Sequence, residues 1–224
     1  MRRKCAISRL SAVAPFVNRR KSMPCSTKNW FVAIGASGPQ GLDDIIRLLG
    51  AMPADSAAIF MVVLHRPSNQ KSELLHILQR CCAMPVRIAE QAEELQPGVC
   101  YIGEPAEHLT LMSQGRADMI AGAKDAYRNR TVDLLLASIA RIAKHRAIGV
   151  ILSGALDDGS RGLAEIHAAG GVTMVLQPCV TAHGMQQNAI EYDGPVTRVG
   201  TSEELAREIC RLVAEPISGL CGAE

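Results

Sequence analysis

The chain has 224 residues, of which 48% are hydrophobic, enough for one α/β domain with a closed core. No run approaches the roughly 18 uncharged apolar residues of a membrane-spanning helix, so we expect no membrane insertion. The net charge of +2 hides an asymmetry: residues 1–28 carry eight basic residues and no acidic one, and the remaining acidic body argues against nucleic acid as a partner.

The basic N-terminal segment predicts an extension rather than an export signal, because Arg9 interrupts its only apolar stretch. We therefore divide the chain into a disordered extension over 1–29, one domain over 30–214 and a loose tail over 215–224. The eight cysteines form no C-x-x-C pair. They give no reason to expect a metal site or a disulfide framework, and they fit a cytoplasmic protein.

The stretch FVAIGASGPQG at residues 31–41 organises the predicted fold. An uncharged strand breaks at Gly35 into a glycine-rich turn that holds one hydroxyl, Ser37, and residues 41–49 then follow helical spacing. Ser37 is therefore expected where the carboxyl end of a strand meets the amino end of a helix. Open α/β sheets place their chemistry in this crevice.

The later segments alternate between strand and helix patterns. Apolar runs predict strands over 58–64, 86–89, 99–102, 147–152 and 171–176, and residues 108–122 predict a hairpin turned at Gln114 and Gly115. Helices are expected around 74–78 and over 131–144, 185–190 and 203–213, with another after the 147–152 strand that Asp157, Asp158 or Ser160 can cap. The fold class is therefore α/β: a doubly wound, Rossmann-like three-layer fold with a mostly parallel sheet and a β-hairpin insertion.

Three of the long strands end near reactive residues: Ser37, His65 and Asp158, with Asp157 as a rival acid. The carboxyl ends of parallel strands share one edge, so these residues can converge. Serine becomes a nucleophile when histidine accepts its proton, and an acid holds the histidine's tautomer. The pattern predicts a serine hydrolase, although each residue taken alone also fits a turn or capping role.

The glycines offer a competing interpretation. Gly35, Gly38 and Gly41 approach the spacing of a turn that holds the phosphates of a dinucleotide. The acid that usually follows the second strand of such folds is absent, because that strand ends in His65 and Arg66. This argues against a dinucleotide-binding protein.

The chain over 31–213 resembles the catalytic domain of the chemotaxis protein-glutamate methylesterases of the CheB type, without a receiver domain in front. The matching motifs follow one another in order: VAIGAS (32–37), VVLHRP (62–67), PGVCYIGEPAEHLTL (97–111), TVDLLLASIA (131–140), IGVILSGALDDGSRGL (148–163), AGGVTMV (169–175) and GMQQNAI (184–190).

The resemblance implies a serine esterase that removes methyl esters from receptor glutamates in chemotaxis or related signalling and can deamidate receptor glutamines. It implies no cofactor, a methylated receptor or other protein as substrate, and a regulatory protein as a possible further partner. The family's nucleophile falls on Ser37, its histidine on His65 and its aspartate on Asp158. A histidine that neighbours the family's active site falls on His108, and the glycine-methionine loop falls on Gly184 and Met185.

The serine loop departs from the family pattern, which reads GAS-x-GG. Here Gly38 replaces a threonine that helps to form the oxyanion hole, and Pro39 stands in a loop one residue longer. Ala155 and Leu156 replace small residues or glycine before the acid, and Gln186 replaces a proline. We expect backbone N–H groups near Gly38 and Ala155 to hold the oxyanion. The alternative is a weakened or silent methylesterase-like module that binds or regulates.

Overall fold

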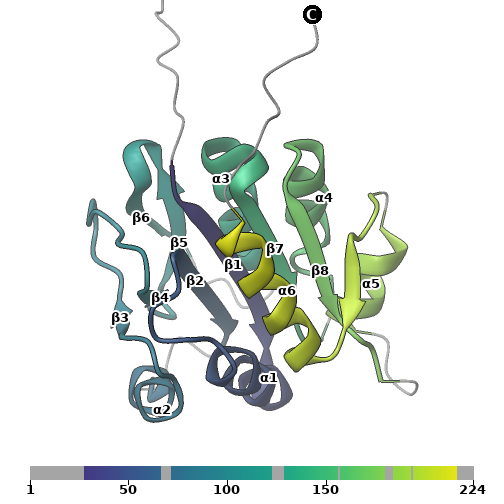
Figure 1. Ribbon diagram of the computed structural model, residues 1–224, viewed down its shortest axis with the longest axis horizontal. Helices are drawn as coiled ribbons and strands as arrows, with labels where there is room; N and C mark the ends of the chain where they lie inside the picture. Colours follow the sequence, from purple (N-terminus) through teal and green to yellow (C-terminus); the bar gives the residue numbers. More distant parts are fainter. Residues whose placement is uncertain are drawn as a thin grey trace, which may run out of the picture.

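Seven parallel strands form the central sheet of the computed structural model, in the order β3-β4-β2-β1-β7-β8-β9 (Figure 1). Their bounds are β1 Trp30–Ser37, β2 Ala58–His65, β3 Val86–Ile88, β4 Cys100–Ile102, β7 Ala147–Ile151, β8 Val172–Leu176 and β9 Arg198–Gly200. The structure describes residues 28–66, 72–122, 129–155, 157–179, 184–192 and 194–215. The predictions for residues 1–27, the tail from residue 216 and Leu156 lie outside these ranges.

Helices cover both faces of the sheet (Figure 1). One face carries α1, α2 and α6, and the other carries α3, α4 and α5. Their bounds are α1 Gly38–Gly50, α2 Leu74–Cys81, α3 Thr131–Ala143, α4 Ser160–Ala168, α5 Met185–Glu191 and α6 Ser202–Ala214. No helix in the described ranges is long and apolar enough to cross a lipid bilayer. The predicted three-layer α/β fold is confirmed.

Side-chain alternation along β1 and β2 creates two separate cores. Val32 and Ile34 pack on the face of α1, α2 and α6, whereas Phe31 and Ala33 pack on the face of α3 and α4. Successive residues of a strand point to opposite faces, so a residue's position in the strand decides its face. Ser37 has the same parity as Phe31 and Ala33, and its extended backbone (φ −144°, ψ 143°) continues the alternation toward α3.

The predicted hairpin is present as β5 (Glu107–Met112) paired antiparallel with β6 (Arg116–Ala121). Its connection, the 3₁₀ turn η1 (Ser113–Gly115), has positive φ at Gln114 (66°) and Gly115 (73°), a backbone that suits the twist of a tight hairpin. The β5 strand packs on α3, and one contact between them is a hydrogen bond of 2.9 Å that the Ser138 hydroxyl of α3 accepts from Leu111 N–H. The hairpin thereby closes the side of the sheet on which Ser37 lies.

The structure corrects one helix boundary and adds one strand. The helix expected over 41–49 begins at Gly38, because Pro39 suits the first turn of a helix, where no N–H is needed. The short edge strand β9 was not predicted. It has three residues and Val199 is exposed, so the apolar pattern that marks the buried strands is missing.

Candidate active site

Ser37 ends β1 and is the N-cap residue of α1, yet its hydroxyl makes no capping hydrogen bond to the helix. Its backbone N–H donates to Ser153 O (2.9 Å), just beyond the end of β7. Gly38 follows with φ +70°, a conformation that favours glycine. Because β2 and β7 flank β1 on opposite sides, Ser37 lies at the topological switch point of the sheet.

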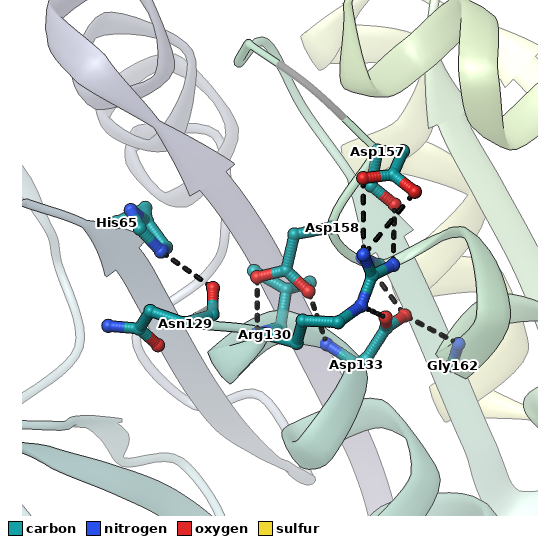
Figure 2. A network of polar contacts seen from close by, with 9 residues as sticks. His65, Asn129, Arg130, Asp133, Asp157, Asp158 and Gly162 are labelled. Atoms are coloured by element: carbon teal, nitrogen blue, oxygen red, sulfur yellow. Dashed lines mark hydrogen bonds and ion pairs between the residues drawn. The ribbon is translucent and has the colours of Figure 1, made fainter. Parts of the chain in front are cut away.

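His65 lies beside Ser37, since the two residues are register partners on the parallel strands β1 and β2. The ring nitrogen Nε2 of His65 lies 2.9 Å from the main-chain oxygen of Asn129 (Figure 2). The hydrogen bonds among the described residues include none that joins His65 to Ser37 or to Asp158. The fold thus brings the serine and the histidine together, and the histidine ring is held by a backbone carbonyl.

Asp158 lies beyond Asn129, where it caps α3 (Figure 2). Its two carboxylate oxygens accept hydrogen bonds of 3.0 Å from the backbone N–H groups of Val132 and Asp133. The side chain is buried. Burial raises its pKa above the usual value for aspartate, and the two N–H donors oppose that shift only in part.

Asp133 provides the reverse contact, from α3 to α4. Its Oδ1 accepts hydrogen bonds from the backbone N–H groups of Gly159 (3.0 Å) and Gly162 (2.8 Å) at the start of α4. The prediction that Asp157, Asp158 or Ser160 caps α4 is therefore wrong. Asp133, which lies 26 positions before Gly159, caps α4, whereas Asp158 caps α3.

Arg130 joins this network at the N-cap position of α3. Its guanidinium donates to the Asp133 carboxylate (2.6 Å) and to Oδ1 of Asp157 (3.1 Å), and also to the main-chain oxygen of Asp157 (3.2 Å). The sequence did not predict these roles for Asn129, Arg130 and Asp133. The only local signal was an aspartate in the first turn of a predicted helix, which does not reveal a partner in a distant loop.

Two segments, the loop that holds Gly154 and the loop that holds Gly184 and Met185, pack closely around Ser37. A Cβ atom placed on Gly154 would lie 2.2 Å from Met185 Sδ and 2.8 Å from Ser37 Cβ. Met185 N–H donates to Gly154 O (2.9 Å), and a Cβ atom on Gly184 would lie 2.4 Å from that same oxygen. Gly154 and Met185 therefore adjoin Ser37, with Ala155 one residue further along the loop.

His108 lies in β5 with a buried side chain, next to Gly122 at the end of the hairpin. Burial lowers its pKa below the usual value for histidine, and the neighbouring charge of His65 lowers it further. Its Nδ1 is buried without a hydrogen-bond partner in the described structure. His108 is therefore a buried histidine close enough to His65 for the charge of His65 to disfavour its protonation.

Two clefts adjoin His65. A polar one is lined by Arg66, Glu104, Glu107 and Asn129, and an apolar groove is lined by Pro39, Leu42, Leu64, Leu74 and Ile77. Within the described ranges, no group of three or more His, Cys, Asp or Glu side chains is placed to hold a metal ion. The space around His65 is therefore bounded by polar and charged groups of both signs on one side and by aliphatic groups on the other.

Fold and site together define a three-layer α/β protein with a serine and a histidine side by side at the carboxyl edge of a parallel sheet. The family model for CheB methylesterase matches residues 32–209, and the chain belongs to that family. The solved CheB methylesterase catalytic domain of Thermotoga maritima is similar, with a TM-score of 0.74 and 29% sequence identity. The match covers 83% of this chain and all of that domain.

Relatives of the chain carry methylesterase names, in agreement with the family model. The chain is 33% identical over 188 residues to protein-glutamate methylesterase/protein-glutamine glutaminase 3 of Shewanella oneidensis, covering 82% of this chain and 52% of that protein. It is 28% identical over 182 residues to a putative protein of the same designation from Leptospira interrogans, covering 81% of this chain and 93% of that protein. The chain thus spans about half the length of the Shewanella relative and nearly all of the Leptospira one.

Proposed function

We propose that this protein is a serine esterase that removes methyl groups from glutamate side chains of chemoreceptor-type proteins and can also deamidate their glutamines. The names of its relatives supply the substrate class. The observation that carries the proposal is the register pairing of Ser37 with His65 at the carboxyl ends of neighbouring parallel strands, within a family of methylesterases.

Ser37 is the proposed nucleophile and His65 the general base. The Ser37 hydroxyl proton passes to His65 as Oγ attacks the ester carbonyl carbon, and the imidazolium then returns the proton to the departing methoxide, which leaves as methanol. Water hydrolyses the acyl-serine by the same route and leaves a glutamate carboxylate with a regenerated serine. The free Ser37 hydroxyl supports this role, because it is not consumed in capping α1.

The oxyanion of the tetrahedral intermediate needs N–H donors close to Ser37. We assign this role to backbone groups near Gly38 and Ala155, at the amino end of α1 and in the loop after β7. A helix N-terminus carries partial positive charge and suits a developing negative oxygen. Met185 adjoins this loop through Gly154, and we assign it to the wall of the ester site.

Asp158 is the proposed acid that keeps His65 in its working orientation, and His108 is a neighbour that lines the site. Asp158 is buried behind Asn129, whose carbonyl contacts His65 (Figure 2). A negative charge at this depth also favours the imidazolium that forms during each proton transfer.

A second candidate function is a methylesterase-like module that binds a receptor without turnover. It is favoured by one observation: His65 contacts the Asn129 carbonyl rather than the carboxylate of Asp158. This candidate predicts receptor binding with no methanol release.

The two candidates are separated by methanol release from a methylated receptor. The esterase predicts release by the wild-type chain and none by Ser37→Ala. Ser160→Ala is the matched control, because this serine starts α4 and its buried hydroxyl has no partner in the described structure. Release by Ser37→Ala at the wild-type rate would contradict the proposed nucleophile, and no release by the folded wild type would favour the binding module.

A further inference from the structure

We propose that Nδ1 of His65 takes the Ser37 proton while the Nε2–H of the same ring donates to the Asn129 carbonyl. Three residues, Asp158, Asp133 and Arg130, hold that carbonyl in place through the amino ends of α3 and α4. The inference rests on the proposed esterase and specifies how its base works. Asp158 then acts as a positioning residue, in place of a direct hydrogen bond to the histidine.

The contact with Asn129 defines the tautomer of His65. A carbonyl oxygen only accepts hydrogen bonds, so Nε2, which lies 2.9 Å from it, carries the ring proton. A neutral imidazole has one protonated nitrogen, and Nδ1 therefore keeps the lone pair that can accept a proton. The base nitrogen is the one that does not face Asn129.

From the strand geometry we infer that this nitrogen is the one nearer Ser37. Neighbouring strands are about 4.8 Å apart, and residues of one register pair point to the same face of the sheet. Ser37 and His65 form such a pair. The serine hydroxyl extends only one bond from Cβ, so it reaches the ring nitrogen nearer the backbone, Nδ1, more readily than the distal Nε2.

Asn129 is held by an exchange of caps between two helices. It lies two positions before the start of α3, and Asp158 accepts the N–H groups of Val132 and Asp133 in the first turn of that helix. Asp133 in turn accepts the N–H groups of Gly159 and Gly162. The segment that carries Asn129 and the segment that carries Asp158 are thereby fixed to one another.

Arg130 closes the exchange. Its contacts with the Asp133 carboxylate and with Asp157, at 2.6 Å and 3.1 Å, connect the two segments a third time, directly next to Asn129 (Figure 2). Both oxygens of Asp158 accept N–H groups of α3. The carboxylate therefore sets the position of the helix end and, through it, the carbonyl that contacts His65.

The tautomer can be measured directly by long-range ¹H–¹⁵N correlation NMR on the full chain labelled with ¹⁵N-histidine. The chain has six histidines, and His65→Gln identifies the His65 signals. At a pH where the ring is neutral, we expect a protonated Nε2 and an unprotonated Nδ1. A proton on Nδ1, which would leave Nε2 as the base nitrogen, would overturn the inference.

Asp133→Ala tests the positioning role, with Asp118→Ala on the hairpin as the matched control. We expect Asp133→Ala to yield a mixture of both tautomers and to lower kcat on the order of 10²-fold with little change in KM, because a small displacement of a catalytic group has effects of that size. A folded Asp133→Ala with the wild-type tautomer and kcat would contradict the role of the caps.

The two proposals fail in different ways. A wild-type chain with the Nε2–H tautomer and no methanol release would refute the esterase and leave the assignment of the His65 proton standing. Methanol release together with an Nδ1–H tautomer would support the esterase and refute the assignment of the His65 proton to Nε2. Because the wild-type spectrum decides the tautomer, the inference stays testable even where Asp133→Ala fails to fold.

Discussion

Helix α6 is capped by its own residues, whereas α3 and α4 are capped by each other. In α6, the Thr201 hydroxyl accepts the Glu204 N–H (3.3 Å) and the Glu204 carboxylate accepts the Thr201 N–H (2.9 Å), within one turn. In α3 and α4, Asp158 and Asp133 cross between segments 25 and 26 residues apart. A local cap stabilises one helix end. Caps that two helices provide for each other also fix the relative position of the segments before those helices, which here carry Asn129 and Asp158.

The largest expected loss of activity, equal in size to that of Asp133→Ala, comes from Gly154→Ala, which disturbs the serine side of the site and leaves both kinds of cap intact. The new Cβ would lie 2.2 Å from Met185 Sδ and 2.8 Å from Ser37 Cβ, so one of them must move. We expect a loss of methanol release on the order of 10²-fold.

Gly50→Ala is the control for that change, because its Cβ would lie an ordinary 3.5 Å from Cys81 O at the end of α1. Equal activity in both variants would mean that the packing around Ser37 does not govern the reaction.

Breaking the exchanged caps is expected to have the next largest effect, on stability. Asp133→Ala removes the acceptor of two helix N–H groups and one partner of Arg130. Hydrogen bonds to a charged group contribute more than neutral ones, and we expect a loss of about 2–3 kcal/mol in the free energy of unfolding. Urea denaturation measures it, and a loss below that of a local cap would contradict the coupling of the two helices.

Breaking the local cap of α6 is expected to have a smaller effect, on stability alone. Thr201→Ala removes the capping hydroxyl of α6, and the usual cost of such a change is about 1 kcal/mol. Methanol release should be unchanged in this variant, since α6 covers the face of the sheet opposite α3 and α4. A fall in kcat here would show that helix capping in general, rather than the exchange, controls the site.

The smallest expected effect concerns pH. Burial, followed by the charge of His65, lowers the pKa of His108, so the unfolded chain binds this proton at a higher pH than the folded one. His108 therefore contributes stability that is present above the unfolded pKa of about 6.5 and is lost as the pH falls through the lower folded value.

Urea denaturation across this range should show a shallower pH dependence for His108→Gln than for the wild type. His76→Gln is the control, because His76 is exposed beside Glu73. The same slope in all three proteins would contradict the coupling of His108 to its surroundings.

The sequence predicted those parts of the molecule that repeat a local pattern. Uncharged runs marked β1, β2 and β7, and their parallel order followed from the helices between them. The hairpin followed from its turn residues Gln114 and Gly115. Ser37 and His65 could be placed together because parallel strands end at one edge, and the register pairing confirms that neighbourhood.

The contacts behind His65 could not be predicted in the same way. A carboxylate before a helix is equally suited to cap that helix or another one, so the sequence led to the wrong helix for Asp158. The role of Asn129 depends on a main-chain carbonyl, which every residue has. Such contacts depend on where two distant loops meet, and only the folded chain specifies that.

The central claim, an activated serine at the end of β1, is tested most directly with a serine-reactive fluorophosphonate and mass spectrometry of the full chain. The account predicts a covalent adduct on Ser37 in the wild type and its loss in His65→Ala. An adduct on another serine, or a folded wild-type chain that stays unmodified at Ser37, would contradict it.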